Sequence, residues 1–318
     1  GVDSLTVAFR GFDLADTLVT LPSGERVDAP NQSLIYTLSL ESGANADSVI
    51  ALLNASSDVV YAELNGVTMP LAAQYPTDPQ FRAGNQWGAW NYGQSGGTPN
   101  ADTNLPEAWG VTTGSAARYV AIVDEGIDGN STAEFSGRVA LGSDGWDGSA
   151  THGFNVACIM AANANNVISG SPFGMAGVNW SAQIVSFNRS DDITKTVSSV
   201  FKAANSRPDA MNLSWGVFKD KTDGIPLYSA TLRNTLAGAY IKNVPVVASS
   251  GNSPGVTEYP AAFGIGIITV GGSDHNDQWY TGGSYGPHLD VVAPAVNVRT
   301  CDGSSGFADV TGTSFAAP

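Results

Sequence analysis

Short apolar segments alternate with helix-forming segments from residue 105 onward, and this alternation constrains the fold most strongly. The predicted strands are residues 119–123, 183–187, 210–214, 244–249, 267–270 and 289–292, and the predicted helices are residues 152–163, 195–206 and 227–241. Buried strands separated by helices are typical of a parallel sheet that is covered on both faces. The sequence therefore predicts an α/β domain with a doubly wound, mostly parallel sheet over residues 105–318. A functional site in such a sheet lies beyond the carboxyl ends of the strands.

Residues 1–70 have a different pattern, which predicts a separate small α/β domain. We expect strands and one helix, with the strands at residues 5–9, 17–21, 34–40 and 58–64 and the helix at residues 45–54. A unit of about 70 residues buries little surface and is marginally stable alone. Residues 71–104 are rich in Pro and Gly, and Trp87, Trp90 and Tyr92 interrupt them. We interpret this segment as a linker and the start of the next domain, with its aromatic side chains on the larger body.

The composition excludes some partners. The chain of 318 residues has 29 acidic and 14 basic residues and a net charge of −15, so nucleic acid and anionic membranes are not expected partners. No apolar run is long enough to span a bilayer. Only 14% of the residues are charged, and a polar but uncharged surface is common in exported proteins. The two cysteines, Cys158 and Cys301, form one bridge or remain free.

Both ends of the sequence look cut. Residue 1 lies directly in a strand-like run, and residue 318 lies one turn into a predicted helix. We expect a leader before the first residue and further chain after the last. Because a helix of one turn is not stable alone, we expect little or no activity from the 318 residues by themselves.

Residues 312–318, Gly-Thr-Ser-Phe-Ala-Ala-Pro, place a serine where a polar loop turns into a helix-forming run. Thr313 is the expected N-cap, which places Ser314 in the first helical turn. Unpaired N–H groups and the helix dipole favour negative charge there, and a serine that attacks a carbonyl creates an oxyanion. Short motifs of this kind also arise by chance, so a capped helix start explains this stretch equally well alone.

Three more polar residues follow or open predicted elements upstream. Asp124 follows a strand, His152 opens a helix, and Asn252 lies on a Gly-containing turn after another strand. An imidazole is the preferred base for a serine hydroxyl at neutral pH, a carboxylate can orient it, and an amide can donate to an oxyanion. A turn or a cap explains each residue taken singly. Their conjunction with Ser314 indicates nucleophilic catalysis.

The motifs around these four residues resemble those of the subtilases, the subtilisin-like serine peptidases. Asp124-Glu125-Gly126-Ile127 is similar to the family's Asp-x-Gly-Ile/Val stretch, and residues 250–252 resemble its Ala-Gly-Asn. Residues 152–158 match its His-Gly-Thr-His-Val-Ala-Gly helix in part. Residues 312–318 match its Gly-Thr-Ser-Met/Phe-Ala-Ala/Ser-Pro motif fully. The resemblance covers roughly residues 76–318.

Three departures from the family's pattern lie in the predicted helix that His152 opens. Asn155 replaces the family's second histidine, Phe154 replaces a threonine, and Cys158 replaces a glycine. The replaced histidine is not the catalytic one, so the triad survives while the packing beside it differs. A bridge between Cys158 and Cys301 stays open.

The resemblance implies a secreted serine endopeptidase precursor that forms an acyl-enzyme. It assigns Ser314 as the nucleophile, His152 as the base, Asp124 as the residue that orients the base, and Asn252 as the oxyanion donor. Substrate would pair along a first segment, which comprises Ser214, Trp215 and Gly216. Another wall of the main specificity pocket would be formed by Ser249, Ser250 and Gly251. Most enzymes of the family favour large apolar side chains there.

The resemblance also implies polypeptide substrates, a monomer, no cofactor for catalysis, and structural calcium whose ligands the sequence does not assign. Residues 1–70 are similar to a subtilase propeptide, a ferredoxin-like unit that acts as chaperone and intramolecular inhibitor. We expect the processing point between residues 64 and 78. The alternative is a catalytically inactive pseudo-peptidase or a non-functional fragment. An apolar helix that continues after residue 318 would favour the enzyme.

Overall fold

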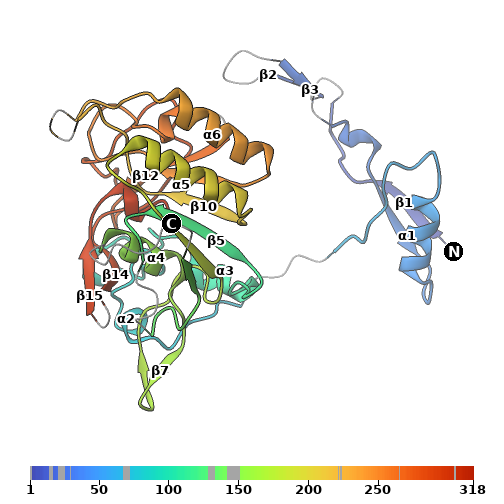
Figure 1. Cartoon of the computed structure of the whole chain (residues 1–318). Coiled ribbons are helices and arrows are strands. Elements are labelled where there is room, and N and C mark those ends of the chain that lie inside the picture. Colours follow the sequence, from blue (N-terminus) through green and yellow to red (C-terminus); the bar gives the residue numbers. More distant parts are fainter. Residues whose placement is uncertain are drawn as a thin grey trace. The chain divides into compact units, whose positions relative to one another are not determined.

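The computed structural model (Figure 1) describes residues 2–13, 17–20, 26–28, 30–66, 72–127, 133–141, 151–220, 222, 224–264, 266–303 and 306–318. The chain divides into two compact units, Gly1–Pro70 and Leu71–Pro318. Within the described ranges, no helix is long and apolar enough to cross a membrane.

In its described residues, the first unit contains antiparallel strand pairs, the α-helix α1 and the short 3-10 helix η2. The paired strands are β1 (Val2–Val7) with β4 (Tyr36–Leu40) and β2 (Leu18–Thr20) with β3 (Arg26–Asp28), and the helices are η2 (Gln32–Leu34) and α1 (Ala46–Asn54). Helix α1 begins after Asn45, whose side chain accepts a hydrogen bond from the backbone N–H of Ser48 at 2.9 Å. This cap explains why the predicted helix forms here.

The predicted strand over residues 58–64 is wrong. The Asn54 amide binds both backbone groups of Ala62: the Ala62 N–H donates to Oδ1 at 2.6 Å, and Nδ2 donates to the Ala62 carbonyl oxygen at 3.0 Å. A side chain thus takes the backbone groups that a neighbouring strand would bind. The described residues of this unit form two separate two-stranded sheets.

The second unit is built around a seven-stranded sheet, which confirms the predicted doubly wound α/β fold. The strand order is β13-β12-β11-β10-β5-β9-β6, and each of these pairings is parallel. The strands are β5 (Tyr119–Asp124), β6 (Val139–Leu141), β9 (Gln183–Asn188), β10 (Ala210–Leu213), β11 (Val246–Ser249), β12 (Ile267–Ser273) and β13 (Val291–Pro294).

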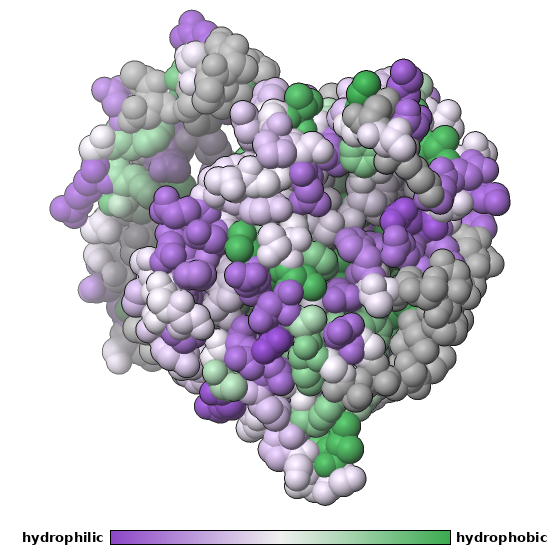
Figure 2. Space-filling view, turned by 90° about the vertical axis from the view of Figure 1, so that its left-hand side faces the viewer, coloured by the Kyte–Doolittle hydropathy of each residue, from purple (hydrophilic) through white to green (hydrophobic). Residues whose placement is uncertain are grey.

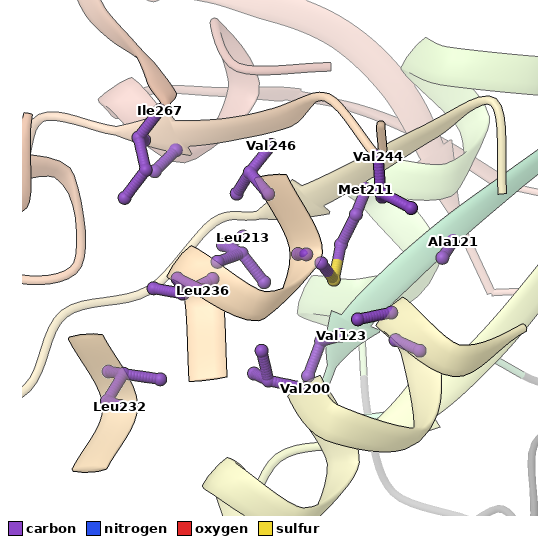
Figure 3. Packing of buried hydrophobic residues seen from close by; sticks show 14 of the residues in the cluster. Ala121, Val123, Val200, Met211, Leu213, Leu232, Leu236, Val244, Val246 and Ile267 are labelled. Carbon is purple, nitrogen blue, oxygen red and sulfur yellow. The ribbon is translucent and has the colours of Figure 1, made fainter. Parts of the chain in front are cut away.

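Helices cover both faces of this sheet. On one face, α5 (Ile193–Asn205) and α6 (Ala230–Ile241) pack their apolar side chains against β5, β10 and β11. Figure 3 shows this core, which includes Val123, Val200, Met211, Leu213, Leu232, Leu236 and Val246. On the other face, α4 (His152–Ala161) packs against β5 and β9 through Val156, Ala157, Ile122 and Ile184. The two buried cores hold the sheet rigidly between the helices.

Side-chain caps set the starts of two helices a few residues away from the predicted ones. The Asp192 side chain accepts a hydrogen bond from the Thr194 N–H at the start of α5, and the Ser229 hydroxyl accepts one from the Leu232 N–H at the start of α6. Because these caps satisfy N–H groups that the helix cannot pair, α5 begins at Ile193 and α6 begins at Ala230.

Residues 72–104 form a folded part of the second unit, whereas the sequence led us to interpret residues 71–104 as a linker and the start of the next domain. They contain α2 (Pro79–Arg82) and η3 (Gln94–Gly96), and α3 (Leu105–Val111) follows. Phe81 is buried and stacks on Trp90 with ring centroids 5.8 Å apart. The aromatic side chains lie on the larger body as predicted, and burying them folds the backbone that carries them.

Two hairpins that the sequence did not predict complete the unit. They are β7 (Asn166–Ile168) with β8 (Ser171–Phe173) and β14 (Val298–Asp302) with β15 (Gly306–Val310), and two 3-10 helices, η4 (Ala261–Phe263) and η5 (Thr313–Phe315), accompany them. A disulfide joins Cys158 of α4 to Cys301 of β14. Figure 2 shows one face of the molecule, on which hydrophilic and neutral side chains predominate and apolar ones form small, separate groups.

Candidate active site

Three adjacent strands bring predicted site residues to one edge of the sheet. Strand β5 ends at Asp124, β10 is followed by Ser214, and β11 ends at Ser249. The order β11-β10-β5 is continuous and parallel, so the carboxyl ends of these strands meet at the same edge. The sheet thus positions residues that lie more than a hundred positions apart in the sequence.

Asp124 and His152 form a close pair. The Asp124 side chain is fully buried, and its Oδ1 lies 2.8 Å from His152 Nδ1 and accepts a hydrogen bond from the Glu125 N–H at 2.7 Å. A carboxylate only accepts hydrogen bonds, so Nδ1 carries the proton and Nε2 remains the basic nitrogen. The pair therefore holds the imidazole in the tautomer that a general base requires.

Opposing effects set the pKa of His152. Burial disfavours the imidazolium, but the hydrogen bond and charge of Asp124, together with the charge of Glu125, outweigh burial and raise the pKa above its ordinary value. Arg189 acts in the opposite direction, and its guanidinium also forms an ion pair with Glu125. The charges around the imidazole thus favour its protonated form.

Gly153 lets α4 approach the end of β5 closely. A Cβ atom at this position would lie 2.5 Å from the carbonyl oxygen of Gly126 and 3.2 Å from Cβ of Asp124. The first contact is closer than a Cβ atom tolerates, and it involves backbone that cannot move aside. A glycine after His152 is therefore required for the short distance between the imidazole and Asp124.

Ser314 lies in the short helix η5, in which Ser314 contacts the residue that follows β10 and the neighbouring Phe315 contacts His152. The His152 ring and the Phe315 ring have centroids 5.5 Å apart. The Ser314 hydroxyl donates to the Ser214 carbonyl oxygen at 3.2 Å, and the Ser214 hydroxyl donates to the Ser314 carbonyl oxygen at 2.8 Å. Among the described residues, the Ser314 hydroxyl bonds to Ser214 and not to His152.

The sequence predicted Thr313 as the N-cap of this helix. In the structure, Gly312 occupies the cap position instead. The Thr313 hydroxyl donates to the Gly251 carbonyl oxygen at 2.9 Å, and the Gly251 N–H donates to the same hydroxyl at 3.1 Å. The Thr313 N–H donates to Asn252 Oδ1 at 2.9 Å. These bonds fix the turn that carries Ser314 to the turn that carries Asn252.

The same contacts orient the Asn252 amide. Its Oδ1 is held by Thr313, and within the described residues its Nδ2 makes no hydrogen bond. An amide whose oxygen is held has its N–H groups free for another acceptor. Nδ2 of Asn252 is therefore available to a negatively charged oxygen that forms near Ser314.

The residues predicted to contact substrate are mostly buried around this site. Trp215 is 8% exposed, and its indole N–H donates to the Val123 carbonyl oxygen at 2.7 Å, so its side chain belongs to the core. Ser249 and Ser250 are buried, and the Ser250 N–H donates to the Val270 carbonyl oxygen at 2.9 Å. Only the backbone of Trp215 is therefore left to meet a substrate.

Two features of this site were not predicted from the sequence. They are the hydrogen bonds by which Thr313 joins two turns and the position of Glu258. Thr313 belongs to the recognised serine motif, but a helix cap was its expected role. Glu258 is 5% exposed and accepts a hydrogen bond from the Asn252 N–H at 3.2 Å. An acidic residue in a run otherwise without charge, residues 250–264, was a signal that could have drawn attention to it.

Comparison with known proteins agrees with this geometry. A family model described as "Subtilase family" matches residues 115–318. The chain is 30% identical over 285 residues to Thermophilic serine proteinase from Bacillus sp. (strain AK1), which covers 86% of this chain and 64% of that relative. It is 32% identical over 214 residues to Subtilisin Savinase from Lederbergia lenta, which covers 65% of this chain and 74% of that relative.

Solved structures show the same fold. A protease from Pseudoalteromonas arctica has a TM-score of 0.62 and 25% identity, over 77% of this chain and 84% of that one. The Prenylagaramide maturation protease PagA has a TM-score of 0.57 and 20% identity, over 67% of this chain and 76% of that one. The chain spans 64% of the Bacillus relative and 52% of an alkaline protease from Shouchella clausii. With a family model over most of its length and a relative that matches 86% of it, the chain belongs to the subtilase family.

Proposed function

We propose that this protein is a serine endopeptidase that hydrolyses peptide bonds through Ser314, His152 and Asp124. The observation that carries the proposal is the 2.8 Å contact between His152 Nδ1 and the buried Asp124 carboxylate, at the strand edge where Ser314 also lies. A carboxylate that fixes an imidazole next to a serine on a tight turn is the arrangement that activates a hydroxyl for attack.

Each residue has one role in the reaction. Ser314 Oγ attacks the peptide carbonyl carbon, while His152 Nε2 takes its proton and later donates it to the leaving amine. Asp124 holds the imidazole and stabilises the imidazolium. Nδ2 of Asn252 and the backbone N–H of Ser314 stabilise the oxyanion. Water then hydrolyses the acyl-enzyme by the same steps in reverse.

A polypeptide substrate would pair with the backbone of residues 214–216 as an added strand. This segment follows β10 directly, so its backbone continues the direction of a sheet strand. A Cβ atom at Gly216 would lie 2.9 Å from the Phe218 ring, so the segment has room for backbone but not for a further side chain. Residues 249–251 would flank the substrate side chain.

The first unit is proposed to be a propeptide that inhibits the enzyme until it is cut away. The match to the Bacillus proteinase covers 86% of this chain, which is more residues than the second unit, Leu71–Pro318, contains. The match therefore includes part of the first unit. The proposed processing point lies between residues 64 and 78, of which residues 67–71 are outside the described ranges. A disulfide within the second unit suits an oxidising compartment, which supports a secreted enzyme, proposed to act as a monomer.

The family resemblance also implies structural calcium, but no group of three or more His, Cys, Asp or Glu side chains that could hold a metal ion lies among the described residues. Asp78 is fully buried, and its Oδ1 has no hydrogen-bond partner among the described residues. Glu134 is 1% exposed, and burial first, then the charge of Asp78, raise its pKa to about 8. Calcium prefers such oxygen ligands. Both Glu134 oxygens already accept hydrogen bonds, from the Met175 N–H and the Asn166 side chain, so of these two carboxylates Asp78 is the one that would offer a calcium ion an unpaired oxygen.

One contact favours the alternative of an inactive pseudo-peptidase. The Ser314 hydroxyl donates to the Ser214 carbonyl oxygen, so in this conformation its proton is directed away from His152. A rotation about one side-chain bond separates this conformation from a catalytic one. Only chemical reactivity distinguishes the two functions.

The test uses the complete reading frame, expressed with Ser314 intact and with Ser314→Ala. We expect the intact form to split between the two units and to be labelled at Ser314 by a fluorophosphonate, and the alanine form to stay whole and unlabelled. Mass analysis measures both outcomes. An intact form that neither splits nor reacts would establish the pseudo-peptidase instead.

A further inference from the structure

A buried carboxylate lies between the two segments that would flank the substrate side chain. Glu258 follows the turn after β11, and its N–H donates to the Ser250 carbonyl oxygen at 2.8 Å. A Cβ atom at Gly216 would lie 2.5 Å from Glu258 Oε2, and one at Gly251 would lie 2.2 Å from Cδ. The carboxyl group therefore occupies the space between Gly216 and Gly251. We call these two glycines and Glu258 the specificity site.

Only neutral groups bind this carboxylate. Oε1 accepts from the Asn252 N–H at 3.2 Å and lies 3.5 Å from the Ser284 hydroxyl. In the described part of the chain, no basic side chain forms an ion pair with Glu258. Oε2 is the oxygen next to Gly216. Burial raises the pKa of Glu258, which is the expected effect on a carboxylate that lacks a neighbouring positive charge.

The specificity site is joined to the reaction site directly through Gly251, whose backbone groups bind the Thr313 hydroxyl, and also through Asn252. Asn252 donates its backbone N–H to Glu258, and its side-chain oxygen accepts from Thr313, the residue before Ser314. A substrate side chain that reaches Glu258 would therefore place its own carbonyl group close to Ser314 and the free Nδ2 of Asn252. The residue concerned is the one that supplies the acyl group of the cleaved bond.

We propose that Glu258 makes the enzyme selective for Lys or Arg at the residue whose carbonyl is attacked. An ammonium or guanidinium group would supply the missing positive charge and form charge-assisted hydrogen bonds with Oε2. A large apolar side chain would instead bury the carboxylate without compensation, which is strongly unfavourable. The inference rests on the proposed peptidase function and departs from the apolar preference that the family resemblance implies.

The experiment compares peptides that differ only at this residue: Lys, Arg, norleucine, Phe, Ala and Glu. Norleucine has the length of the lysine stem without its charge, so the Lys-to-norleucine ratio of kcat/KM isolates the charge. We expect the processed wild-type enzyme to cleave the Lys and Arg peptides at least about a hundredfold faster than the norleucine peptide. We expect Glu258→Gln, which keeps the shape and the acceptor oxygen, to lose most of this ratio while still cleaving the norleucine peptide.

Glu107→Gln is the matched control, because it removes the same charge from an exposed position on α3. It should leave the ratio unchanged. If the Glu258→Gln variant does not fold, the kcat/KM values of the wild-type enzyme for the six peptides test the proposal on their own. A wild-type enzyme that prefers Phe or norleucine would overturn the proposal, and so would one that cleaves only the Ala peptide, because the carboxylate would then merely fill the site.

The test separates this inference from the proposed function. A fluorophosphonate that labels Ser314 in an enzyme with an apolar preference refutes the role of Glu258 and leaves the peptidase function standing. A protein that is not labelled and cleaves no peptide refutes both.

Discussion

The proton balance of the active site depends on a few charged side chains around one imidazole. Asp124 contacts His152 directly, whereas Glu125 and Arg189 act on it through their charges and also pair with each other. Asp124 is buried, while the Glu125 and Arg189 side chains are 38% and 27% exposed. Exposed charges can be changed with less effect on folding, so this pair offers a way to shift the pKa of His152 and leave the triad intact.

We predict that Glu125→Gln moves the acid limb of the pH profile of kcat/KM to lower pH. The activity requires neutral His152, so it falls as the pH drops through the pKa of the imidazole. Glu125 raises that pKa, and its loss lowers it, which keeps the base neutral in more acidic solution. A peptide substrate assayed across the pH range measures the shift.

Arg189→Gln serves as the control of opposite sign, because Arg189 lowers the pKa of His152. Its acid limb should move to higher pH. Identical profiles for the wild type and both variants would contradict the electrostatic account.

At the level of secondary structure, the elements that the sequence predicted best are those that are buried. The strands over residues 119–123 and 244–249 are apolar runs, and the structure contains them as β5 and β11. β6 has three residues, too few for a periodicity to be recognised. The pattern of residues 58–64 indicated a strand because it is apolar and β-branched, but pairing depends on a partner, and the Asn54 side chain takes that place.

The site was predictable where a motif carries it and not where only tertiary contact creates it. Asp124, His152, Asn252 and Ser314 lie in recognisable motifs, and the fold brings them to one edge. Glu258 lies in none of the motifs, and its relation to Gly216, which is more than forty residues away, exists only after the strands pair. The local sequence could therefore draw attention to Glu258 as an isolated acidic residue, but it could not reveal that Glu258 lies between Gly216 and Gly251.

The disulfide is the element-scale feature with the clearest energetic consequence. It joins the helix that carries His152 to β14 across 143 residues of chain. We predict that Cys158→Ala combined with Cys301→Ala lowers the free energy of unfolding by about 2–4 kcal/mol, because the unfolded chain regains the freedom that the bridge removes. Denaturant unfolding of the processed, active-site-blocked enzyme measures the loss.

Wild-type enzyme unfolded in the presence of a reductant should show the same decrease in stability, since the bridge is then also absent. Both sulfur-bearing residues are buried in the folded protein, so reduction should require unfolding. Equal unfolding midpoints for the wild type and the double variant without reductant would contradict the prediction.

Over the whole molecule, the excess of acidic residues means that a bound cation would stabilise the folded state. The net charge is −15, and two of the carboxylates, Asp78 and Glu134, are buried in the second unit. Asp78 precedes α2, and its Oδ1 has no hydrogen-bond partner among the described residues, so it offers an oxygen to a bound cation. Without a cation, burial of these groups costs stability.

We predict that calcium raises the melting temperature of the blocked enzyme and that a chelator lowers it. The ion would bind the folded state and not the unfolded one, so it stabilises by mass action. Asp78→Asn should lose most of the response, whereas Glu107→Gln should keep it. Calorimetry with matched ionic strength measures the effect, and an equal response to magnesium would indicate general charge screening instead.

The reciprocal hydrogen bonds between Ser214 and Ser314 span 100 residues of sequence, and they have a consequence for synthesis. A chain leaves the ribosome amino end first, so Asp124 and His152 emerge long before the serine that they would activate. Until Ser314 has emerged and docked beside β10, the growing chain holds a base and an acid but no nucleophile. If the protein is the proposed peptidase, translation order itself delays its activity, and a ribosome that stalls before this point releases a chain without the proposed nucleophile.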